Sequence, residues 1–320
     1  MKTFSKNFSA ILTFLVLVAG GWLVLNSQDV IDWWKLRGYV PSDQIVRLSN
    51  DASFSDEGRR LFYVHDPALL TKDQFKGKCT VGEETIVLGC YISQEKIYVF
   101  DVDDNRLEGI EQVTAAHEML HAVYDRLSSR EKKVLDARLV AFYETINDER
   151  LKKTIENYRD RDPSIVPNEL HSILGTEVRK LPQDLELHYS KYFLNRQSVV
   201  TLSEAYETEF TLRQTKIEEY DTQLKQISAS IDSKENQLAL LGKALEDEQE
   251  ILQSLRNRPE QYNAAVPGFN EKVVDYNRQL EDIKADIAKY NNIVEQRNLI
   301  ASEEQDLVNA IDTREIPLEK

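Results

Sequence analysis

Residues 115–124 read AAHEMLHAVY, and this stretch decides how the rest of the chain is interpreted. Two of the five histidines in the 320-residue chain, His117 and His121, lie four positions apart, with Glu118 directly after the first. On a helix, residues four apart share one face, so both imidazoles can reach one metal ion. Residues 110–127 contain no proline or glycine, which favours a helix over the whole segment.

The histidines fall on the apolar stripe of this expected helix, which runs through Ile110, Val113, His117, Leu120, His121, Tyr124 and Leu127. They are therefore expected to point inward. Glu118 lies one step round the helix, where its carboxylate can reach a water molecule at the metal without binding the metal itself. A strand-like segment, Ile97–Val102, precedes the helix, and we expect it to be the edge strand along which an extended peptide lies. The alternative is an ordinary helix that carries two histidines and an acid by coincidence.

A catalytic zinc ion needs a third protein ligand and an open position for water. The segment Val166–Glu177 is the best source of that ligand, because Pro167 suits a helix start. Glu169, Ile173 and Glu177 then share one helix face.

The HEMLH segment, followed downstream by NELHSILG, resembles the gluzincin branch of the zincin metallopeptidases. NELHSILG is similar to the glutamate-bearing helix of thermolysin-type enzymes, and ELHSILGTEVRKLP resembles the third-ligand helix of the ImmA/IrrE-type zincins. Both comparisons place the ligand on Glu169. The chain departs from these patterns at Ile173, where such families often carry an acidic or amide residue. Glu177 or His171 is the alternative, either as the third ligand or as a support for a ligand histidine.

The resemblance implies a zincin-like α+β domain that hydrolyses peptide bonds with one Zn²⁺ per chain. Glu118 acts as the general base in such a site. An oxyanion partner is also expected, and His188 and Tyr192 are the candidates, with ordinary packed aromatic side chains as the alternative.

The N-terminal 28 residues are expected to form a membrane anchor. Lys2 and Lys6 precede an uncharged, mostly apolar run over residues 7–28, which is long enough to span a bilayer as a helix. The lysines place the N-terminus in the cytoplasm and the rest of the chain outside. A cleaved signal peptide is the alternative. In that compartment, Cys79 and Cys90 are expected to form a disulfide, with two buried thiols as the alternative.

Four segments are expected along the chain: an anchor (1–28), a linker with a short helix (29–54), the zincin-like domain (55–205) and a coiled-coil hairpin (206–315). Strands are expected at Leu61–Val64, Thr85–Leu88 and Ile97–Phe100. Helices are expected from about residue 105 to residue 210, with breaks near Ser128–Ser129, Asp162–Pro163 and Leu181–Pro182.

Apolar residues recur every seven positions after Phe210, through Ile217, Leu224, Ile231, Leu238, Leu245 and Leu252. The run stops at Arg258–Pro259, Pro267–Gly268 is expected in the turn, and a second heptad run begins at Phe269. An antiparallel hairpin is the expected structure, and parallel dimerisation of each arm is the alternative.

Two functions from different classes remain. The first is a membrane-anchored, extracytoplasmic zinc metallopeptidase that acts on a peptide or protein substrate, and the second is a non-catalytic, metal-binding envelope scaffold that acts through the hairpin. A partner protein or self-association through the coiled coil fits either. The net charge of −15 argues against nucleic acid as a partner, since phosphate binding needs a basic face.

Overall fold

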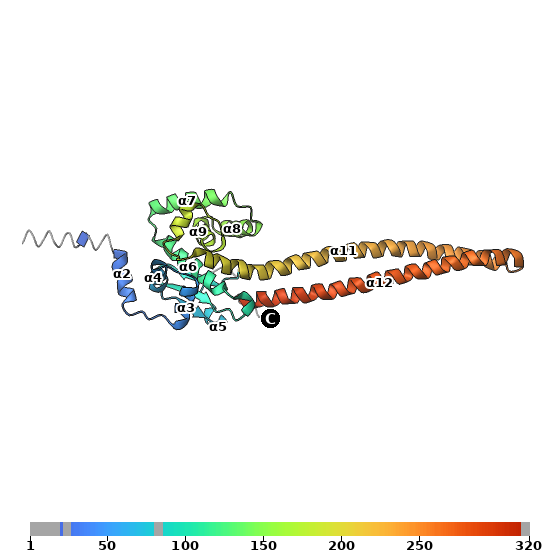
Figure 1. The fold of residues 1–320 in the computed structure, drawn as a ribbon, viewed down its shortest axis with the longest axis horizontal. Helices are drawn as coiled ribbons and strands as arrows, with labels where there is room; N and C mark the ends of the chain where they lie inside the picture. The colour runs from blue at the N-terminus through green and yellow to red at the C-terminus, as the bar shows by residue number, and fades with distance from the viewer. Residues whose placement is uncertain (1–19, 22–26, 80–85, 315–320) are drawn as a thin grey trace, which may run out of the picture. The chain divides into compact units, whose positions relative to one another are not determined.

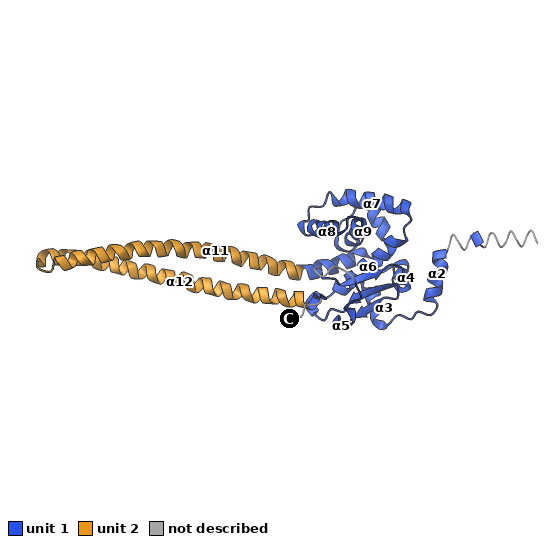
Figure 2. Cartoon of the chain, turned by 180° about the vertical axis from the view of Figure 1, so that it is seen from behind, with its two compact units in different colours: residues 1–207, 310–320 blue, residues 208–309 orange. Residues whose placement is uncertain are grey.

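The structure is a computed structural model that describes residues 20–21, 27–79 and 86–314. The chain divides into two compact units, which Figure 2 shows in different colours. Unit 1 comprises residues 1–207 and 310–320, and unit 2 comprises residues 208–309. Unit 1 is an α+β domain, and unit 2 is a long helical hairpin (Figure 1).

Unit 1 opens with three short helices, α2 (Ser27–Leu36), α3 (Asp43–Asp51) and α4 (Asp56–Val64). Ser42 caps α3, since its hydroxyl accepts a hydrogen bond from the Ile45 N–H at 3.3 Å. Ile45 and Leu48 on α3 are buried in the hydrophobic core. The segment 29–54, expected to be a linker with a short helix, thus contains two helices, and the second packs into the domain.

The strand predicted at Leu61–Val64 is wrong, because these residues end helix α4. The Ser55 hydroxyl accepts a hydrogen bond from the Gly58 N–H at 3.1 Å and starts the helix. Gly58, Leu61 and Phe62 are buried at the i, i+3, i+4 spacing of a helix face. A short apolar run fits a buried strand as well as one face of a helix, and here the cap decides between them.

The sheet has three strands, β1 (Ala68–Leu70), β2 (Gly89–Ile92) and β3 (Lys96–Phe100), in the order β1-β3-β2. β1 runs parallel to β3, and β2 pairs with β3 as an antiparallel hairpin with Cys90 opposite Tyr98. The hairpin was predicted, but its first strand lies at residues 89–92 rather than 85–88. The tight turn at Ser93–Glu95 fixes this register, with Gln94 in a left-handed conformation (φ 60°). β3 is the central strand, so the prediction that Ile97–Val102 forms the edge is wrong. β1 and β2 are the two edge strands, and β2 is the one that packs against α6.

A short helix, α5 (Lys72–Phe75), follows β1, and a 3₁₀ turn, η1 (Asn105–Leu107), follows β3. Five helices come next: α6 (Ile110–Arg126), α7 (Ser129–Tyr143), α8 (Glu149–Arg161), α9 (Val166–Glu177) and α10 (Gln183–Tyr189). The three predicted helix breaks are confirmed. The hydrophobic core joins residues of α3, α4, β3 and α6 through α10 around Met119 and Leu120, which are fully buried.

The second unit is formed by α11 (Arg196–Ser254), whose first residues belong to unit 1, and α12 (Pro259–Ile311). Cross-helix ion pairs show that the arms are antiparallel: Asp221–Arg297 (3.0 Å), Lys234–Asp286 (2.7 Å) and Glu248–Lys272 (2.8 Å). The predicted helical hairpin is confirmed, whereas the expected turn at Pro267–Gly268 is not, because Pro267 lies inside α12. The chain turns before Pro259, which suits a first helical position since proline lacks the N–H that would be unpaired there.

The expected membrane anchor, residues 1–28, lies mostly outside the described residues. Within the part of the chain that the structure describes, no helix is both long and apolar enough to cross a membrane. Cys79 and Cys90 are joined by a disulfide.

Candidate metal centre

Helix α6 carries His117 and His121 on one face. The two imidazole rings are 4.7 Å apart between centroids and nearly perpendicular, at 82°. The helix begins after Gly109, whose φ of 96° lies in the left-handed region that favours glycine. In its first turn, the Glu111 carboxylate accepts a hydrogen bond from the Val102 N–H at 3.0 Å. The spacing seen in the sequence therefore becomes a pair of imidazoles held on a rigid helix.

Helix α9 brings Glu169 to the two histidines. Its carboxylate oxygens lie 3.5 Å from His117 Nε2 and 3.8 Å from His121 Nε2. α9 approaches α6 closely at Gly175, where a Cβ atom would lie 2.4 Å from Leu120 Cδ1. The position of Glu169, the third candidate ligand, thus depends on Gly175, which leaves room for α6 to pack closely against α9.

His117, His121 and Glu169 form a group that fits a metal ion. One ligand atom from each lies within 4.8 Å of the others, and no second such group of His, Cys, Asp or Glu occurs among the described residues. Glu169 Oε2 is buried and has no hydrogen-bond partner within the described part of the chain. A buried, unpaired carboxylate oxygen is costly unless a cation or a donor satisfies it. Two imidazoles and one carboxylate are also a donor set found in catalytic zinc sites.

A hydrogen bond fixes the orientation of His121. Its Nδ1 donates to the Asn168 side-chain oxygen at 3.0 Å and lies 3.2 Å from the Ser172 hydroxyl. Because an amide oxygen only accepts, Nδ1 carries the proton and Nε2 keeps its lone pair toward Glu169. That tautomer is the one required for metal binding through Nε2.

Burial and the two imidazoles act in opposite directions on Glu169. Burial raises the pKa of this carboxyl, but the positive charges that His117 and His121 carry when protonated lower it by more, so that the net pKa is below the ordinary value. The carboxylate form, which is the metal-binding form, is therefore favoured.

Glu118 lies beside the triad without belonging to it. Its side chain is buried, and burial raises the pKa of its carboxyl to about 7, against an opposing effect of His121. The backbone N–H of Tyr91 on β2 faces this carboxylate and acts to lower its pKa. β2 approaches closely because residue 89 is glycine: a Cβ there would lie 2.5 Å from Thr114 Cγ2 and 3.0 Å from Glu118 Cγ. The Glu118 side chain thus lies between its own helix, α6, and the edge strand β2.

A cavity of about 380 Å³ opens over this group. The cavity is lined by residues 86–91, which include the start of β2, and by residues of α6, α8 and α9. His117, Glu118, His121 and Glu169 all line the cavity. A metal ion held by the triad would therefore be accessible to a ligand.

The other predicted site residues lie elsewhere or have other partners. Glu177 lines the cavity but forms an ion pair with Arg150 at 2.9 Å. His171 is fully buried, and its Nε2 lies 2.9 Å from His188 Nε2. Tyr192 packs against the His188 ring, with centroids 5.5 Å apart. His188 and Tyr192 are not among the residues that line the cavity, and both pack against other aromatic rings.

Tyr158 and Asn168 are the site residues that sequence reasoning missed. Tyr158, on α8, lines the cavity, and its pKa is raised first by burial and then by the charges of Glu169 and Glu118. The phenol therefore stays protonated and can donate a hydrogen bond in the cavity. The sequence spacing between Tyr158 and the histidines gives no sign that Tyr158 belongs to the site. Asn168 could have been predicted, because it directly precedes the predicted ligand Glu169.

No family model matches this chain, and comparison with curated proteins and with solved structures finds no match either. The resemblance to zincins thus rests on the short motifs and on the geometry of the triad.

Proposed function

We propose that this protein is a zinc-dependent metallopeptidase, anchored in a membrane by its N-terminal segment, with unit 1 on the extracytoplasmic side. The observation that carries the proposal is the position of Glu118, a buried acid beside a His-His-Glu triad and in contact with an edge strand. A site that only stores a metal ion has no need of a second carboxylate in that place that does not bind the metal.

The triad would hold zinc through His117 and His121 imidazole nitrogens and a Glu169 carboxylate oxygen. When bound, zinc supplies Lewis acidity, which lowers the pKa of water and polarises a carbonyl group. Glu118 takes a proton from the attacking water and passes it to the leaving amine. Tyr158 donates a hydrogen bond to the oxygen on which negative charge develops.

An extended peptide is the substrate that this cavity suits best. β2 is at the edge of the sheet, and its Tyr91 N–H faces the Glu118 carboxylate. An edge strand offers backbone hydrogen bonds to a second strand independently of its sequence. The backbone groups of Val87 are already bonded to Thr313. We therefore infer that a peptide lies along Gly89–Tyr91, with its scissile bond close to Glu118.

Two features of the chain support the location. Lys2 and Lys6 precede the uncharged run at residues 7–28, which favours a cytoplasmic N-terminus. The Cys79–Cys90 disulfide suits an oxidising compartment.

A non-catalytic scaffold is the second candidate, and the hairpin is the observation that favours it. Unit 2 exposes Leu240 (72%), Val274 (68%) and Leu299 (62%), which are large apolar side chains available to a partner protein. In this case, the triad would bind metal for structure alone.

Metal content and turnover of the full chain, purified in detergent, distinguish the two candidates. We expect about one zinc per chain by mass spectrometry, lost in His117→Ala and in His121→Ala. Glu118→Gln should keep the zinc and lower cleavage of a peptide pool by at least roughly 10²-fold, since glutamine cannot accept the proton. Glu111→Gln is the matched control on the same helix, because its amide oxygen can still accept the Val102 N–H. Retention of zinc by a variant that carries both His117→Ala and His121→Ala would refute the site. If wild type and Glu118→Gln restore the phenotype of a strain that lacks the gene equally well, the scaffold is favoured.

A further inference from the structure

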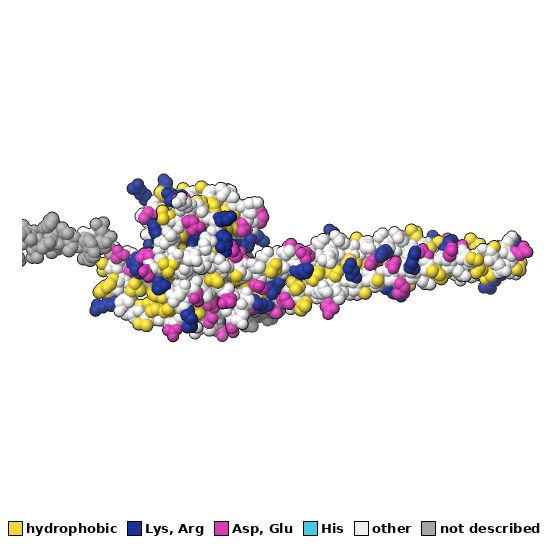
Figure 3. All heavy atoms as spheres, viewed as in Figure 1, with side chains coloured by type: hydrophobic (Ala, Val, Ile, Leu, Met, Phe, Trp, Pro, Cys, Tyr) yellow, Lys and Arg dark blue, Asp and Glu magenta, His cyan; other side chains and the backbone are white. Residues whose placement is uncertain are grey.

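Helix α2 exposes apolar side chains and buries a charged one, which is the reverse of an ordinary surface helix. A surface helix normally buries its apolar side chains and exposes its polar ones. In α2, Asp32 is the buried residue, at 1% exposure. The exposed residues include four large apolar side chains: Val30 (37%), Ile31 (48%), Trp33 (61%) and Trp34 (73%). Yellow side chains are visible over α2 in Figure 3.

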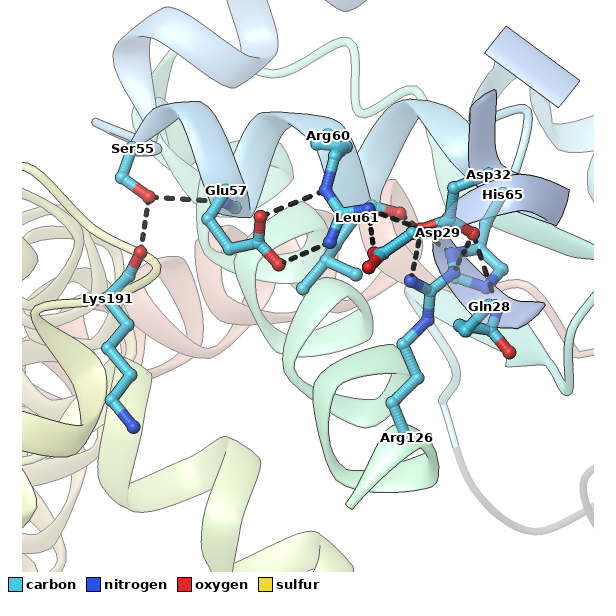
Figure 4. A network of polar contacts seen from close by, with 11 residues as sticks. Gln28, Asp29, Asp32, Ser55, Glu57, Arg60, Leu61, His65, Arg126 and Lys191 are labelled. Atoms are coloured by element: carbon cyan, nitrogen blue, oxygen red, sulfur yellow. Dashed lines mark hydrogen bonds and ion pairs between the residues drawn. The ribbon is translucent and has the colours of Figure 1, made fainter. Parts of the chain in front are cut away.

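The polar face of α2 is fixed to the domain by a network of charges (Figure 4). The Asp32 carboxylate accepts two hydrogen bonds from the Arg126 guanidinium, at 2.6 and 2.9 Å, and one from Arg60 at 2.7 Å. Lys35 Nζ donates to the Gln94 carbonyl oxygen at 2.7 Å. A paired, two-pronged contact of this kind holds a helix in one orientation. The apolar face of α2 therefore cannot turn inward without breaking the network.

Contiguous large apolar side chains on one helix face need an apolar partner. Two adjacent tryptophans favour the lipid headgroup region over the interior of a protein, because each ring is largely apolar and carries one N–H donor. The Arg37 guanidinium lies over the Trp33 ring at 5.4 Å, and cationic side chains are favoured beside anionic headgroups. The uncharged run at residues 7–28 also leads directly into this helix.

We propose that the outer face of α2 lies in the interfacial layer of a lipid bilayer, with Trp33 and Trp34 among the headgroups. This inference does not depend on catalysis. It has a geometric consequence, because Arg126, which binds Asp32, is the last residue of helix α6. His121 is only five residues before Arg126, or about 7.5 Å along the helix axis. Contact between α2 and the bilayer would thus hold the candidate metal centre near the membrane surface.

Tryptophan fluorescence of the full chain in lipid vesicles tests the proposal. The chain has three tryptophans, so Trp22→Phe leaves Trp33 and Trp34 as the only emitters. The protein is reconstituted in vesicles of zwitterionic and anionic lipids, with or without bromine on the acyl chains near the headgroups. We expect a blue-shifted emission that the brominated lipid quenches roughly two-fold or more, because both rings then lie at the depth of the bromine atoms.

A single tryptophan placed elsewhere on unit 1 is the matched control. Leu194 is as exposed as Trp34, at 75%, so Leu194→Trp in a chain with Trp22, Trp33 and Trp34 changed to Phe reports on a site outside α2. We expect no bromine quenching there. Circular dichroism checks that each variant is folded. Emission of Trp33 and Trp34 typical of water would overturn the proposal. A blue shift without bromine quenching would also overturn it, because the face would then be covered by protein.

Discussion

At the scale of single residues, the candidate centre depends on side chains that select one protonation state of a neighbour. Asn168 fixes the proton of His121 on Nδ1, and the two imidazoles favour the charged form of Glu169. Each effect prepares a metal-binding atom before any metal arrives. Glu118 is different, because it contacts β2 rather than completing the triad.

Tyr158→Phe tests the proposed hydrogen-bond donor in the cavity. Removal of one such donor costs about 10²–10³-fold in kcat, so we expect a loss of that order with zinc content unchanged. KM should change little, since the bond strengthens only as charge develops. Tyr206→Phe is the matched control. Tyr206 lines the same cavity, but neither Glu118 nor Glu169 is among the groups that shift its pKa. An equal loss in both variants, or a rise in KM alone, would contradict the role of Tyr158.

His65 should make the folded domain sensitive to acid. Burial lowers its pKa to about 4, and its Nδ1 donates to the Leu61 carbonyl oxygen at 2.7 Å. The ordinary histidine pKa is about 6.5, so the unfolded chain binds more protons between these values. The free energy of unfolding should therefore fall as the pH drops from about 6.5 toward 4.

Urea denaturation at a series of pH values measures this effect. His65→Asn keeps a donor near the Leu61 oxygen but does not titrate, so the variant should lose about 1–2 kcal/mol less than wild type over the same pH interval. Parallel curves for the two proteins would show that His65 is not the group responsible.

At the scale of elements, sequence periodicity predicted helices better than strands. The i, i+4 histidines and Pro167 placed α6 and α9 correctly, because helix spacing and caps are local signals. Leu61–Val64 was misassigned since the run is short, although the Ser55 cap was visible in the sequence. β2 lies at residues 89–92 rather than at the predicted residues 85–88, because the turn at Ser93–Glu95 sets the register. The content of β-branched residues, on which the prediction rested, does not show where that turn falls. Tyr158 was missed because only tertiary packing of α8 brings it to the site.

Asp32→Asn tests the attachment of α2 to α4 and α6. Burial opposes the charge of Asp32, but the hydrogen bonds and charges of Arg126 and Arg60 still lower its pKa below the ordinary value. Removing this charge leaves two guanidinium groups without their shared partner, and we expect a loss of about 3 kcal/mol in the free energy of unfolding. Asp29→Asn is the control, because Asp29 is 69% exposed and contacts Arg60 at 3.3 Å. Its loss should stay within about 1 kcal/mol. Equal losses would mean that Asp32 does not hold the helix.

At the scale of the whole molecule, the hairpin is inserted into unit 1 rather than appended to it. The chain leaves unit 1 after Glu207 and returns to it at Ala310. The returning segment is bonded to the wall of the cavity: the Thr313 hydroxyl donates to the Val87 carbonyl oxygen at 2.8 Å and accepts from the Val87 N–H at 3.4 Å. A simple C-terminal truncation would therefore disturb the cavity as well as remove the hairpin.

An internal replacement removes the hairpin without this side effect. Arg213 and Glu303 form a cross-helix ion pair at 3.6 Å, so a short glycine-serine linker in place of residues 216–300 can join the two arms next to that pair. We expect this variant to keep its zinc and to cleave short unstructured peptides within about two-fold of the wild-type rate, because Glu118 and the triad are unchanged. It should nevertheless fail to rescue a strain that lacks the gene, if the hairpin recruits the biological substrate. Full rescue by the replacement variant would show that the hairpin is dispensable. Loss of peptide cleavage with zinc retained would instead mean that the hairpin acts on the cavity through Thr313, and Thr313→Val in the full chain should then reproduce that loss.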